Sequence, residues 1–237
     1  AALYADSYGN AQVRALTRAS RAFFDRPPPG FAAHPILAPR GALFVARPDQ
    51  RPQLDALHAE LAPLSPALRR LDRDEILREV PVMRPGRVAA GLLDPDAMDM
   101  DVHALHQGYL RGARAHGATL ICDAEVRAIE RVHDRWRVVA GDRTFDAPQL
   151  ANAAGAWADV VARLAGVAPI GLQPRRRSAF VFAPPDGIAD VARWPLAIGV
   201  DEDWYVKPDA GLLLGSPANA DPVDPHDVQA EELDIAT

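Results

Sequence analysis

Cysteine and long apolar runs are scarce in this sequence of 237 residues. Its one cysteine, Cys122, excludes an internal disulfide, a zinc ribbon, a C-x-x-C redox motif and an iron–sulfur cluster. The apolar neighbours of Cys122 predict a buried, unreactive thiol in a strand. No apolar run approaches the ~18–20 residues that a membrane-spanning helix needs. We therefore expect a cytoplasmic protein without a transmembrane segment.

Positive charge is also in short supply, with 26 basic against 32 acidic residues and a net charge of −6. Nucleic acids and anionic membranes bind positive protein surfaces, so neither is expected as a general partner. Lys207 is the only lysine, and all other basic residues are arginine. Arginine is thus abundant by composition, and a role for any single arginine has to be argued from its position.

Several well-known catalytic motifs are absent. The sequence contains no G-x-S-x-G, no H-E-x-x-H and no Walker loop, so it gives no support to hydrolase or kinase activity. His103 and His106 lie three residues apart on a predicted helix, but no third ligand is near them. We therefore expect no metal site.

Helix-capping residues predict three helices. An Asn or Asp side chain at the start of a helix accepts a hydrogen bond from the first turn, and Pro or Gly ends a helix. These helices are expected at 10–24, 72–80 and 101–116, with caps Asn10, Asp72 and Asp101. Apolar patterns predict further helices at 53–61 and 157–165.

Short strands account for much of the remaining chain. The order of helix, strand, antiparallel ribbon, strand and helix across 101–165 is typical of an α/β dinucleotide-binding fold with an inserted meander. Strand-rich blocks on either side predict a second domain built from two stretches. The expected strands are 43–46, 87–93, 119–122, 125–132, 136–140, 144–146, 150–155 (buried), 178–183, 196–200, 204–206 and 212–215.

Residues 152–157 (NAAGAW) form the most informative local motif. Small residues at a strand-to-helix turn let the backbone approach a ligand closely, and the start of the next helix favours phosphate. The same residues also suit a tight turn that needs small side chains only for packing. The motif alone leaves both interpretations open.

Arginine and tyrosine supply the candidate binding side chains. One arginine of 175–177 could clamp a carboxylate through two hydrogen bonds, although a solvated run of charge has the same composition. The hydroxyls of Tyr8 and Tyr205 could bind a carboxylate or an amine at a pocket wall, although most tyrosines simply pack with the hydroxyl at the surface.

Eight segments together carry a resemblance that none carries alone. In this order they resemble the FAD-dependent D-amino-acid oxidase superfamily, and within it the bacterial D-arginine dehydrogenases, over essentially the whole chain. The segments are 1–4 (AALY), 7–9 (SYG), 13–17 (VRALT), 105–112 (LHQGYLRG), 152–157 (NAAGAW), 171–180 (GLQPRRRSAF), 205–211 (YVKPDAG) and 215–222 (GSPANADP).

The resemblance implies an oxidoreductase that removes a hydride from the Cα of a D-amino acid. The hydride passes to flavin N5, and water converts the imino acid to a 2-oxo acid and ammonia. Arg177 is implied to clamp the substrate carboxylate, with help from the hydroxyls of Tyr8 and Tyr205. The electron acceptor, a quinone or another molecule, is left open.

The resemblance also implies the cofactor contacts and the domains. FAD is expected to lie beside the backbone of Ala1, Ala2 and Leu3, to meet Val126 at its adenine end and to pass close to Ala154 and Gly155. The implied fold is mixed α/β (α+β), a partial Rossmann-like FAD domain interleaved with a substrate domain on a mixed or antiparallel sheet. The FAD-binding pieces are 1–30 and 97–173, and the substrate-binding pieces are 31–96 and 174–237.

The sequence departs from the family at several points. The family's initial Gly-rich turn and its C-terminal part do not occur in these residues, so we expect an internal part of the enzyme that neither holds FAD tightly nor turns over by itself. Ala42 stands where a D-arginine dehydrogenase has a glutamate for the guanidinium, and Leu3 stands where it has a histidine. The first change predicts D-amino acids with less basic, apolar side chains.

Two other functions remain open. One is a glycine or sarcosine type of amine oxidase within the same superfamily. The other is a non-catalytic protein that keeps the shell of the fold.

Overall fold

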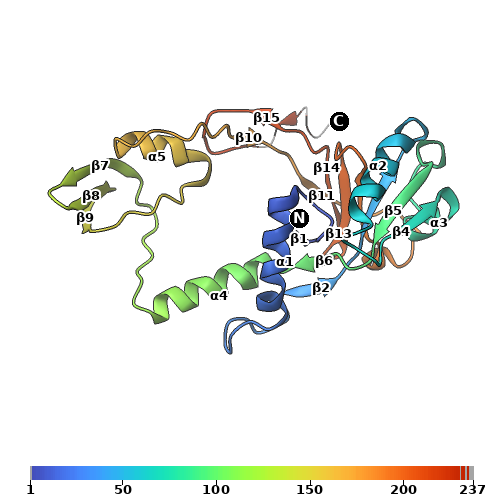
Figure 1. The fold of residues 1–237 in the computed structure, drawn as a ribbon, viewed down its shortest axis with the longest axis horizontal. Helices are drawn as coiled ribbons and strands as arrows, with labels where there is room; N and C mark the ends of the chain where they lie inside the picture. Colours follow the sequence, from blue (N-terminus) through green and yellow to red (C-terminus); the bar gives the residue numbers. More distant parts are fainter. Residues whose placement is uncertain (1, 230, 233, 235–237) are drawn as a thin grey trace. The chain divides into compact units, whose positions relative to one another are not determined.

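The computed structural model describes residues 2–229, 231–232 and 234 (Figure 1). Packing divides the chain into two compact units. Unit 1 contains Ala1–His116, Ser178–Asn219 and Glu231–Thr237, and unit 2 contains Gly117–Arg177 and Ala220–Ala230. These units are groups of residues that pack together. The domains predicted from the sequence are instead named for the ligand that each is expected to bind, FAD or substrate, so they stay a prediction.

Unit 1 is built around a seven-stranded mixed sheet. Only the β12–β3 pair in this sheet is parallel, and the other pairs among the described residues are antiparallel. The mixed α/β class predicted from the sequence is therefore confirmed. In sheet order the strands are β11 (Phe180–Phe182), β14 (Leu212–Ser216), β13 (Tyr205–Asp209), β12 (Leu196–Gly199), β3 (Ala42–Ala46), β5 (Ala90–Asp94) and β4 (Arg69–Asp72).

Each face of this sheet carries its own apolar cluster, because side chains alternate along a strand. Leu43 and Val45 of β3 belong to cluster 1, together with Ile76 of α3 (Arg73–Glu79). Ala42 and Phe44 belong to cluster 2, together with Leu54 of α2 (Arg51–Leu61). Figure 1 shows both helices beside β5.

A second sheet of unit 1 has the order β1–β6–β2. The helices α1 (Ala11–Asp25) and α4 (Val102–Ala115) follow β1 and β6 in the chain. Apolar residues around Tyr4 and Ile36 form cluster 3, against which Phe24 of α1 and Leu105 of α4 pack. The strands are β1 (Leu3–Tyr4), β6 (Met98–Met100) and β2 (Leu37–Pro39).

The three predicted caps of unit 1 are confirmed. The Asn10 side chain accepts from the backbone N–H of Val13 (3.0 Å), and the Asp101 side chain accepts from that of Ala104 (2.8 Å). Asp72 and Glu75 form a reciprocal capping box, with both hydrogen bonds at 2.8 Å. Local hydrogen bonding within one turn is enough to fix these ends.

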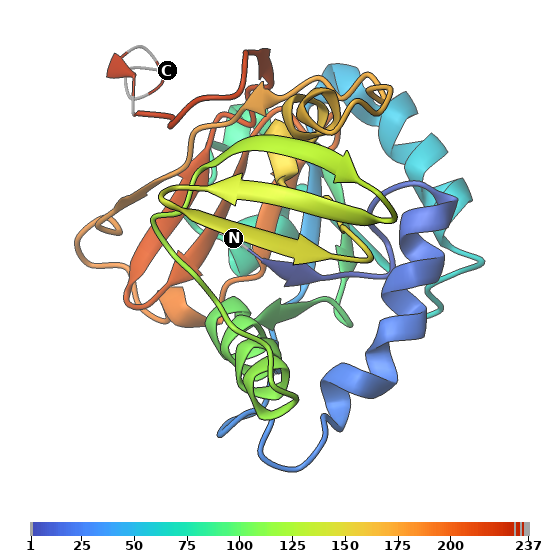
Figure 2. The ribbon, with the colours of Figure 1, turned by 90° about the vertical axis from the view of Figure 1, so that its left-hand side faces the viewer.

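Unit 2 contains a three-stranded meander, as the sequence predicts (Figure 2). Helix α5 (Ala158–Leu164) packs on its first strand, and the short pair β10–β15 closes the unit. The strands are β7 (Val126–Val132), β8 (Arg135–Ala140), β9 (Arg143–Ala147), β10 (Arg175–Arg176) and β15 (Asp221–Pro222).

Two predicted strands of unit 2 are wrong. Residues 119–122 and 150–155 form no strand, Cys122 is exposed rather than buried, and 150–155 instead lead into a 3₁₀ turn at Gly155–Trp157. A strand needs a neighbouring backbone to satisfy its N–H and C=O groups, and none of the described strands pairs with either segment. Apolar composition alone does not supply that partner.

Membrane-spanning helices were also sought. Within the described part of the chain, no helix combines the length and the apolar character that a bilayer crossing requires.

Tyr4 makes the stability of unit 1 sensitive to alkaline pH. Burial raises the pKa of Tyr4 from its ordinary 10.0 to about 12, and the hydrogen bond from its hydroxyl to Asp6 adds to the rise. Folding therefore favours the neutral phenol. This stabilisation is fully present below pH ~10 and is lost as the pH rises toward ~12, and two pH units correspond to at most about 2–3 kcal/mol.

We expect Tyr4→Phe to remove this part of the alkaline decline in the free energy of unfolding. Denaturant unfolding from pH 8 to 12 measures the effect, with Tyr109→Phe as the control because Tyr109 is exposed. A decline of equal size in wild type and Tyr4→Phe would contradict the assignment to Tyr4.

Candidate functional site

Two tyrosines predicted to bind substrate lie at neighbouring positions of unit 1. Tyr205 stands on β13, flanked by Ile198 and Ser216 on the adjacent strands. Tyr8 lies in the loop between β1 and α1, and its hydroxyl donates to Oε2 of Glu202 at 3.1 Å. Because Glu202 lies in the turn just before Tyr205, the structure brings the Tyr8 loop to the start of β13.

The Tyr8 loop has a conformation that its own sequence sets. Gly9 has a φ of +86°, and a Cβ there would lie 2.8 Å from Cγ1 of Val13. A larger residue is therefore excluded by both backbone strain and contact. Ser7 is 3% exposed, and its Oγ has no hydrogen-bond partner among the described residues.

Leu3, Tyr205 and Ala42 meet at one apolar cluster. Leu3 and Tyr205 both pack against cluster 2, to which Ala42 belongs. Leu3 pairs with Asp99 of β6, and the Ala2 carbonyl accepts from the N–H of Met100 at 3.2 Å. A residue predicted to face the flavin and one predicted to face the substrate thus share a buried neighbourhood. Ala1, the other predicted flavin neighbour, lies outside the described residues.

Ala42 occupies a closed position. It is 2% exposed and pairs with Leu196 on one side and with Asp94 on the other. Its partners in cluster 2 include Ala5, Ala97 and Leu196. The Asp94 carboxylate beside it is also buried, and it accepts from the N–H of Asp96 at 3.1 Å.

A charged network beside Tyr205 is not predicted from the sequence. Lys207 lies two residues after Tyr205, so both side chains extend from the same face of β13. The Lys207 Nζ lies 2.6 Å from Oδ1 of Asp99, and the Arg40 Nε lies 2.7 Å from Oδ2. The one sequence feature that could have pointed to this network is that Lys207 is the only lysine of the chain. The spacing of residues in the sequence does not show that Asp99 is its partner.

The predicted carboxylate clamp lies in unit 2. Arg176 is buried and forms an ion pair with Asp221 (3.1 Å), whereas Arg175 and Arg177 are exposed. Arg175 donates to the carbonyl of Ala220 at 2.8 Å. Arg177 is the last residue of the first segment of unit 2. Burial thus alternates along the three arginines, while the role of Arg177 stays a prediction.

A buried carboxylate holds the segment that leads to these arginines. Asp159 of α5 accepts hydrogen bonds from three consecutive backbone N–H groups. The distances are 3.1 Å to Ile170, 3.0 Å to Gly171 and 2.9 Å to Leu172. Sequence reasoning missed this anchor, because its partners lie in an irregular segment.

The predicted cofactor turn is ordered by its own asparagine. Oδ1 of Asn152 accepts from the N–H of Ala154 (3.2 Å), and Nδ2 donates to the carbonyl of Ala158 (2.8 Å). Gly155 has a φ of +55°, and a Cβ there would meet no described atom within 4 Å. The backbone at Ala154 and Gly155 is thus fixed and open on one side.

Val126 begins the meander opposite Ala140. It lines an apolar cavity of about 410 Å³ together with Trp136 and Phe145. Val126, Ala154, Gly155 and Arg177 all belong to unit 2, and Leu3, Tyr8 and Tyr205 belong to unit 1. The structure thus brings Leu3, Tyr8 and Tyr205 close together in unit 1, whereas the grouping of the four unit 2 residues into one site stays a prediction.

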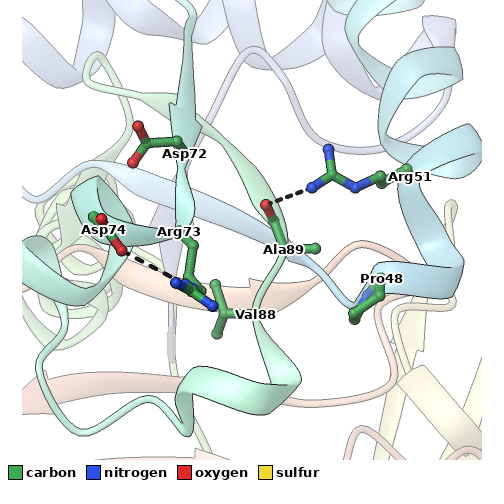
Figure 3. A pocket seen from close by; sticks show the side chains of 7 residues that line it. All are labelled: Pro48, Arg51, Asp72, Arg73, Asp74, Val88 and Ala89. Carbon is green, nitrogen blue, oxygen red and sulfur yellow. Dashed lines mark hydrogen bonds and ion pairs between the residues drawn. The ribbon is translucent and has the colours of Figure 1, made fainter.

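Unit 1 also contains a cavity, of about 420 Å³, near the starts of α2 and α3 (Figure 3). Arg51 donates to the carbonyl of Ala89 (3.2 Å), and Arg73 pairs with Asp74 (3.5 Å). Asp72 is engaged in the capping box. These polar groups interact within the chain, and none of the predicted site residues lines this cavity.

Solved structures share this fold. Glycine oxidase from Geobacillus kaustophilus superposes with a TM-score of 0.79 at 18% identity, covering 100% of this chain and 64% of that chain. L-proline dehydrogenase from P. horikoshii gives a TM-score of 0.78 at 18% identity, covering 98% and 62%. At this identity the likeness concerns the fold alone.

Sequence comparison adds a curated relative, the mitochondrial dimethylglycine dehydrogenase of Mus musculus. It is 24% identical over 147 residues, which are 61% of this chain and 17% of that protein. The chain therefore spans about a sixth of that relative and less than two thirds of the two solved structures. The closer resemblance to D-arginine dehydrogenases is not shown by these relatives.

The family itself is shown by a match along almost the whole chain. The family model described as FAD dependent oxidoreductase, DAO, matches residues 1–236. FAD is the cofactor of this family. The chain belongs to the DAO family of FAD-dependent oxidoreductases.

Proposed function

We propose that this chain contributes substrate contacts and part of the FAD contacts of an enzyme that oxidises the CH–NH₂ group of D-amino acids with apolar side chains. The observation that carries the proposal is the packing of Leu3, Tyr205 and Ala42 around cluster 2. The family match supports amine oxidation with FAD. The preference for D-amino acids rests on the resemblance of the eight sequence segments to D-arginine dehydrogenases.

The residues of the chain fit a flat cofactor that approaches the backbone closely. The turn at Ala154 and Gly155 is fixed by Asn152 and is open beside Gly155. In unit 1, the buried Ser7 hydroxyl has no partner among the described residues, and a buried hydroxyl of this kind is costly unless a ligand satisfies it. Bound FAD supplies the acceptor for the hydride that leaves the substrate Cα.

Each proposed substrate contact has a distinct chemical task. The planar guanidinium of Arg177 matches a carboxylate through two parallel hydrogen bonds. The Tyr205 hydroxyl can donate to a carboxylate or orient the amine, and the Tyr8 hydroxyl can do so once it leaves Glu202. Ala42 carries no acceptor for a guanidinium, and the carboxylate of its strand partner Asp94 is buried and accepts from the N–H of Asp96. The imino acid that results is hydrolysed to a 2-oxo acid and ammonia.

The substrate preference is tested by comparing kcat/KM for D-leucine and D-arginine on the intact flavin-containing enzyme. A charged hydrogen bond contributes about 1.5–3 kcal/mol, so its loss at residue 42 lowers the kcat/KM for D-arginine by roughly 10- to 100-fold relative to an enzyme that has the glutamate. We expect D-leucine to be the better substrate. A strong preference for D-arginine would contradict the proposed preference for apolar side chains.

A glycine or sarcosine type of oxidase is the second candidate. Ala42 is 2% exposed and closely packed, and this favours a small substrate. Adding glycine and sarcosine to the same substrate panel separates the two candidates. Comparing oxygen uptake with dye reduction in the same assays identifies the class of electron acceptor. Absence of flavin reduction with every amine would favour a non-catalytic protein.

A further inference from the structure

Asp99 occupies a crossing point between the two sheets of unit 1. It lies in the middle of β6, where its backbone pairs with Leu3 of β1 and with Ala38 of β2. Its side chain extends to β13 of the seven-stranded sheet, where Oδ1 lies 2.6 Å from the Lys207 Nζ. One residue therefore contacts the strand of Leu3 through the backbone and the strand of Tyr205 through its carboxylate.

The ion pair of Asp99 and Lys207 is largely shielded from water, and further hydrogen bonds hold it in place. The Lys207 side chain is 7% exposed and that of Asp99 is 21% exposed. The other Asp99 oxygen binds Arg40, which also donates to the carbonyls of Ala192 (2.7 Å) and Trp194 (2.9 Å). Charges held this far from water keep their geometry, because separating them leaves a buried charge without a partner.

Short backbone links and one apolar cluster also join the two sheets. Arg40 and Gly41 connect β2 to β3, and both donate their backbone N–H groups to the carbonyl of Ala97, at 3.2 and 2.8 Å. No backbone ladder among the described residues joins β1–β6–β2 to the seven-stranded sheet. Leu3 and Tyr205 meet through cluster 2, and apolar packing constrains volume more than direction. A hydrogen-bonded ion pair fixes both distance and angle. The ion pair of Asp99 with Lys207 therefore adds a directional contact between β6 and β13 to the short backbone links and to the hydrogen bond of Tyr8 with Glu202.

We propose that Asp99 and Lys207 are positioning residues whose ion pair sets Tyr205, and with it the substrate Cα, at the reacting distance from the flavin beside Leu3. This inference rests on the proposed function. Neither residue touches the substrate in this scheme. Their effect is on alignment, and a misplacement of about 1 Å lowers a reaction rate by up to ~100-fold.

Lys207→Met is the first test. Methionine keeps the apolar stem of the lysine, and Asp99 keeps its ion pair with Arg40, so the variant is expected to fold. Stopped-flow measurement under anaerobic conditions is expected to show flavin reduction slowed by about 10- to 100-fold, with the substrate Kd changed by less than about threefold. Lys207→Arg is expected to recover most of the rate.

Asp209→Asn is the matched control. Asp209 lies on the same strand, 3.9 Å from the same Lys207 Nζ, and its side chain is 48% exposed. An exposed, long ion pair constrains little, so the rate is expected to stay within about twofold of wild type. An equal loss of rate in Asp209→Asn and Lys207→Met would overturn the proposal.

Asp99→Glu is the second variant and covers the case in which Lys207→Met does not fold. Glutamate keeps the charge and lengthens the connection by one methylene, so alignment changes while the ion pairs persist. A slower reduction with an unchanged substrate Kd is expected. Full wild-type rate in this variant would overturn the proposal.

Hydrogen–deuterium exchange without FAD gives a readout that does not depend on the reaction. In Lys207→Met, the amides of β1 and β6 are expected to exchange faster, while those of β3 stay protected. If the amides of β1 and β6 exchange at the wild-type rate in Lys207→Met, the proposal that this ion pair connects the two sheets is wrong. If the wild-type enzyme oxidises no amine, the proposed function fails. Faster exchange in Lys207→Met would then still show that the ion pair of Asp99 and Lys207 holds β1 and β6 against the seven-stranded sheet.

Discussion

Replacing Arg177 with methionine is expected to lower kcat/KM for the preferred D-amino acid by about 10²- to 10³-fold. A carboxylate that loses a bidentate guanidinium loses two charged hydrogen bonds of about 1.5–3 kcal/mol each, together roughly 3–4 kcal/mol of binding. Steady-state kinetics over a wide range of substrate concentration measures the change. We expect most of it in KM, because the substrate carboxylate is bound equally before and during hydride transfer.

Arg175→Met supplies the control for Arg177→Met. Arg175 belongs to the same run and is also exposed, but its guanidinium donates to the carbonyl of Ala220. Its replacement is expected to change kcat/KM by less than about threefold, as for an ordinary surface residue. Arg176 is unsuitable as a control because it is buried against Asp221. Equal effects of Arg177→Met and Arg175→Met would contradict a specific clamp at Arg177.

Asp159→Ala is expected to cause the largest loss of stability, about 3–5 kcal/mol in the free energy of unfolding of unit 2. The carboxylate accepts from the N–H groups of Ile170, Gly171 and Leu172. Alanine leaves three backbone donors without an acceptor, and each lost partner of a shielded donor costs about 1–3 kcal/mol, partly recovered by water. Denaturant unfolding, followed by the fluorescence of Trp136 and Trp157 in unit 2, measures the loss.

Asp142→Ala is the control for this substitution. Asp142 is also in unit 2, but its side chain is 97% exposed and lies 3.9 Å from its arginine partner. Removing such a pair is expected to change stability by less than ~0.5 kcal/mol. If Asp159→Ala is as stable as Asp142→Ala, the prediction is wrong, and water satisfies the N–H groups of 170–172 as well as the carboxylate of Asp159 does.

Prediction from sequence succeeded where structure is local. The caps Asn10, Asp72 and Asp101 act within one helical turn, so a few neighbouring residues determine them. Six strands of the seven-stranded sheet overlap strands predicted from their apolar residues, whereas β4, whose sequence is Arg-Arg-Leu-Asp, was not predicted. The meander of unit 2 was predicted because its turns connect strands that are adjacent in the chain.

Prediction failed where a partner distant in sequence decides the outcome. Residues 150–155 have the composition of a buried strand, but the described residues offer them no pairing strand. For the candidate site, motif resemblance selected Leu3, Tyr205 and Ala42, which share one cluster. The same reasoning missed Asp99 with Lys207, because an ion pair across two sheets leaves no periodic signal.

The single parallel pair of the large sheet has a consequence for biosynthesis. Leu43 of β3 pairs with Ala197 of β12, and all of 117–177 is inserted between them. A ribosome that adds about 5–20 residues per second takes roughly 8–30 s to deliver the partner strand. During that interval the apolar edge of β3 is open to wrong pairing. Unit 1 is therefore expected to complete its sheet only after the inserted unit has emerged, which makes β3 a natural site for chaperone engagement on the nascent chain.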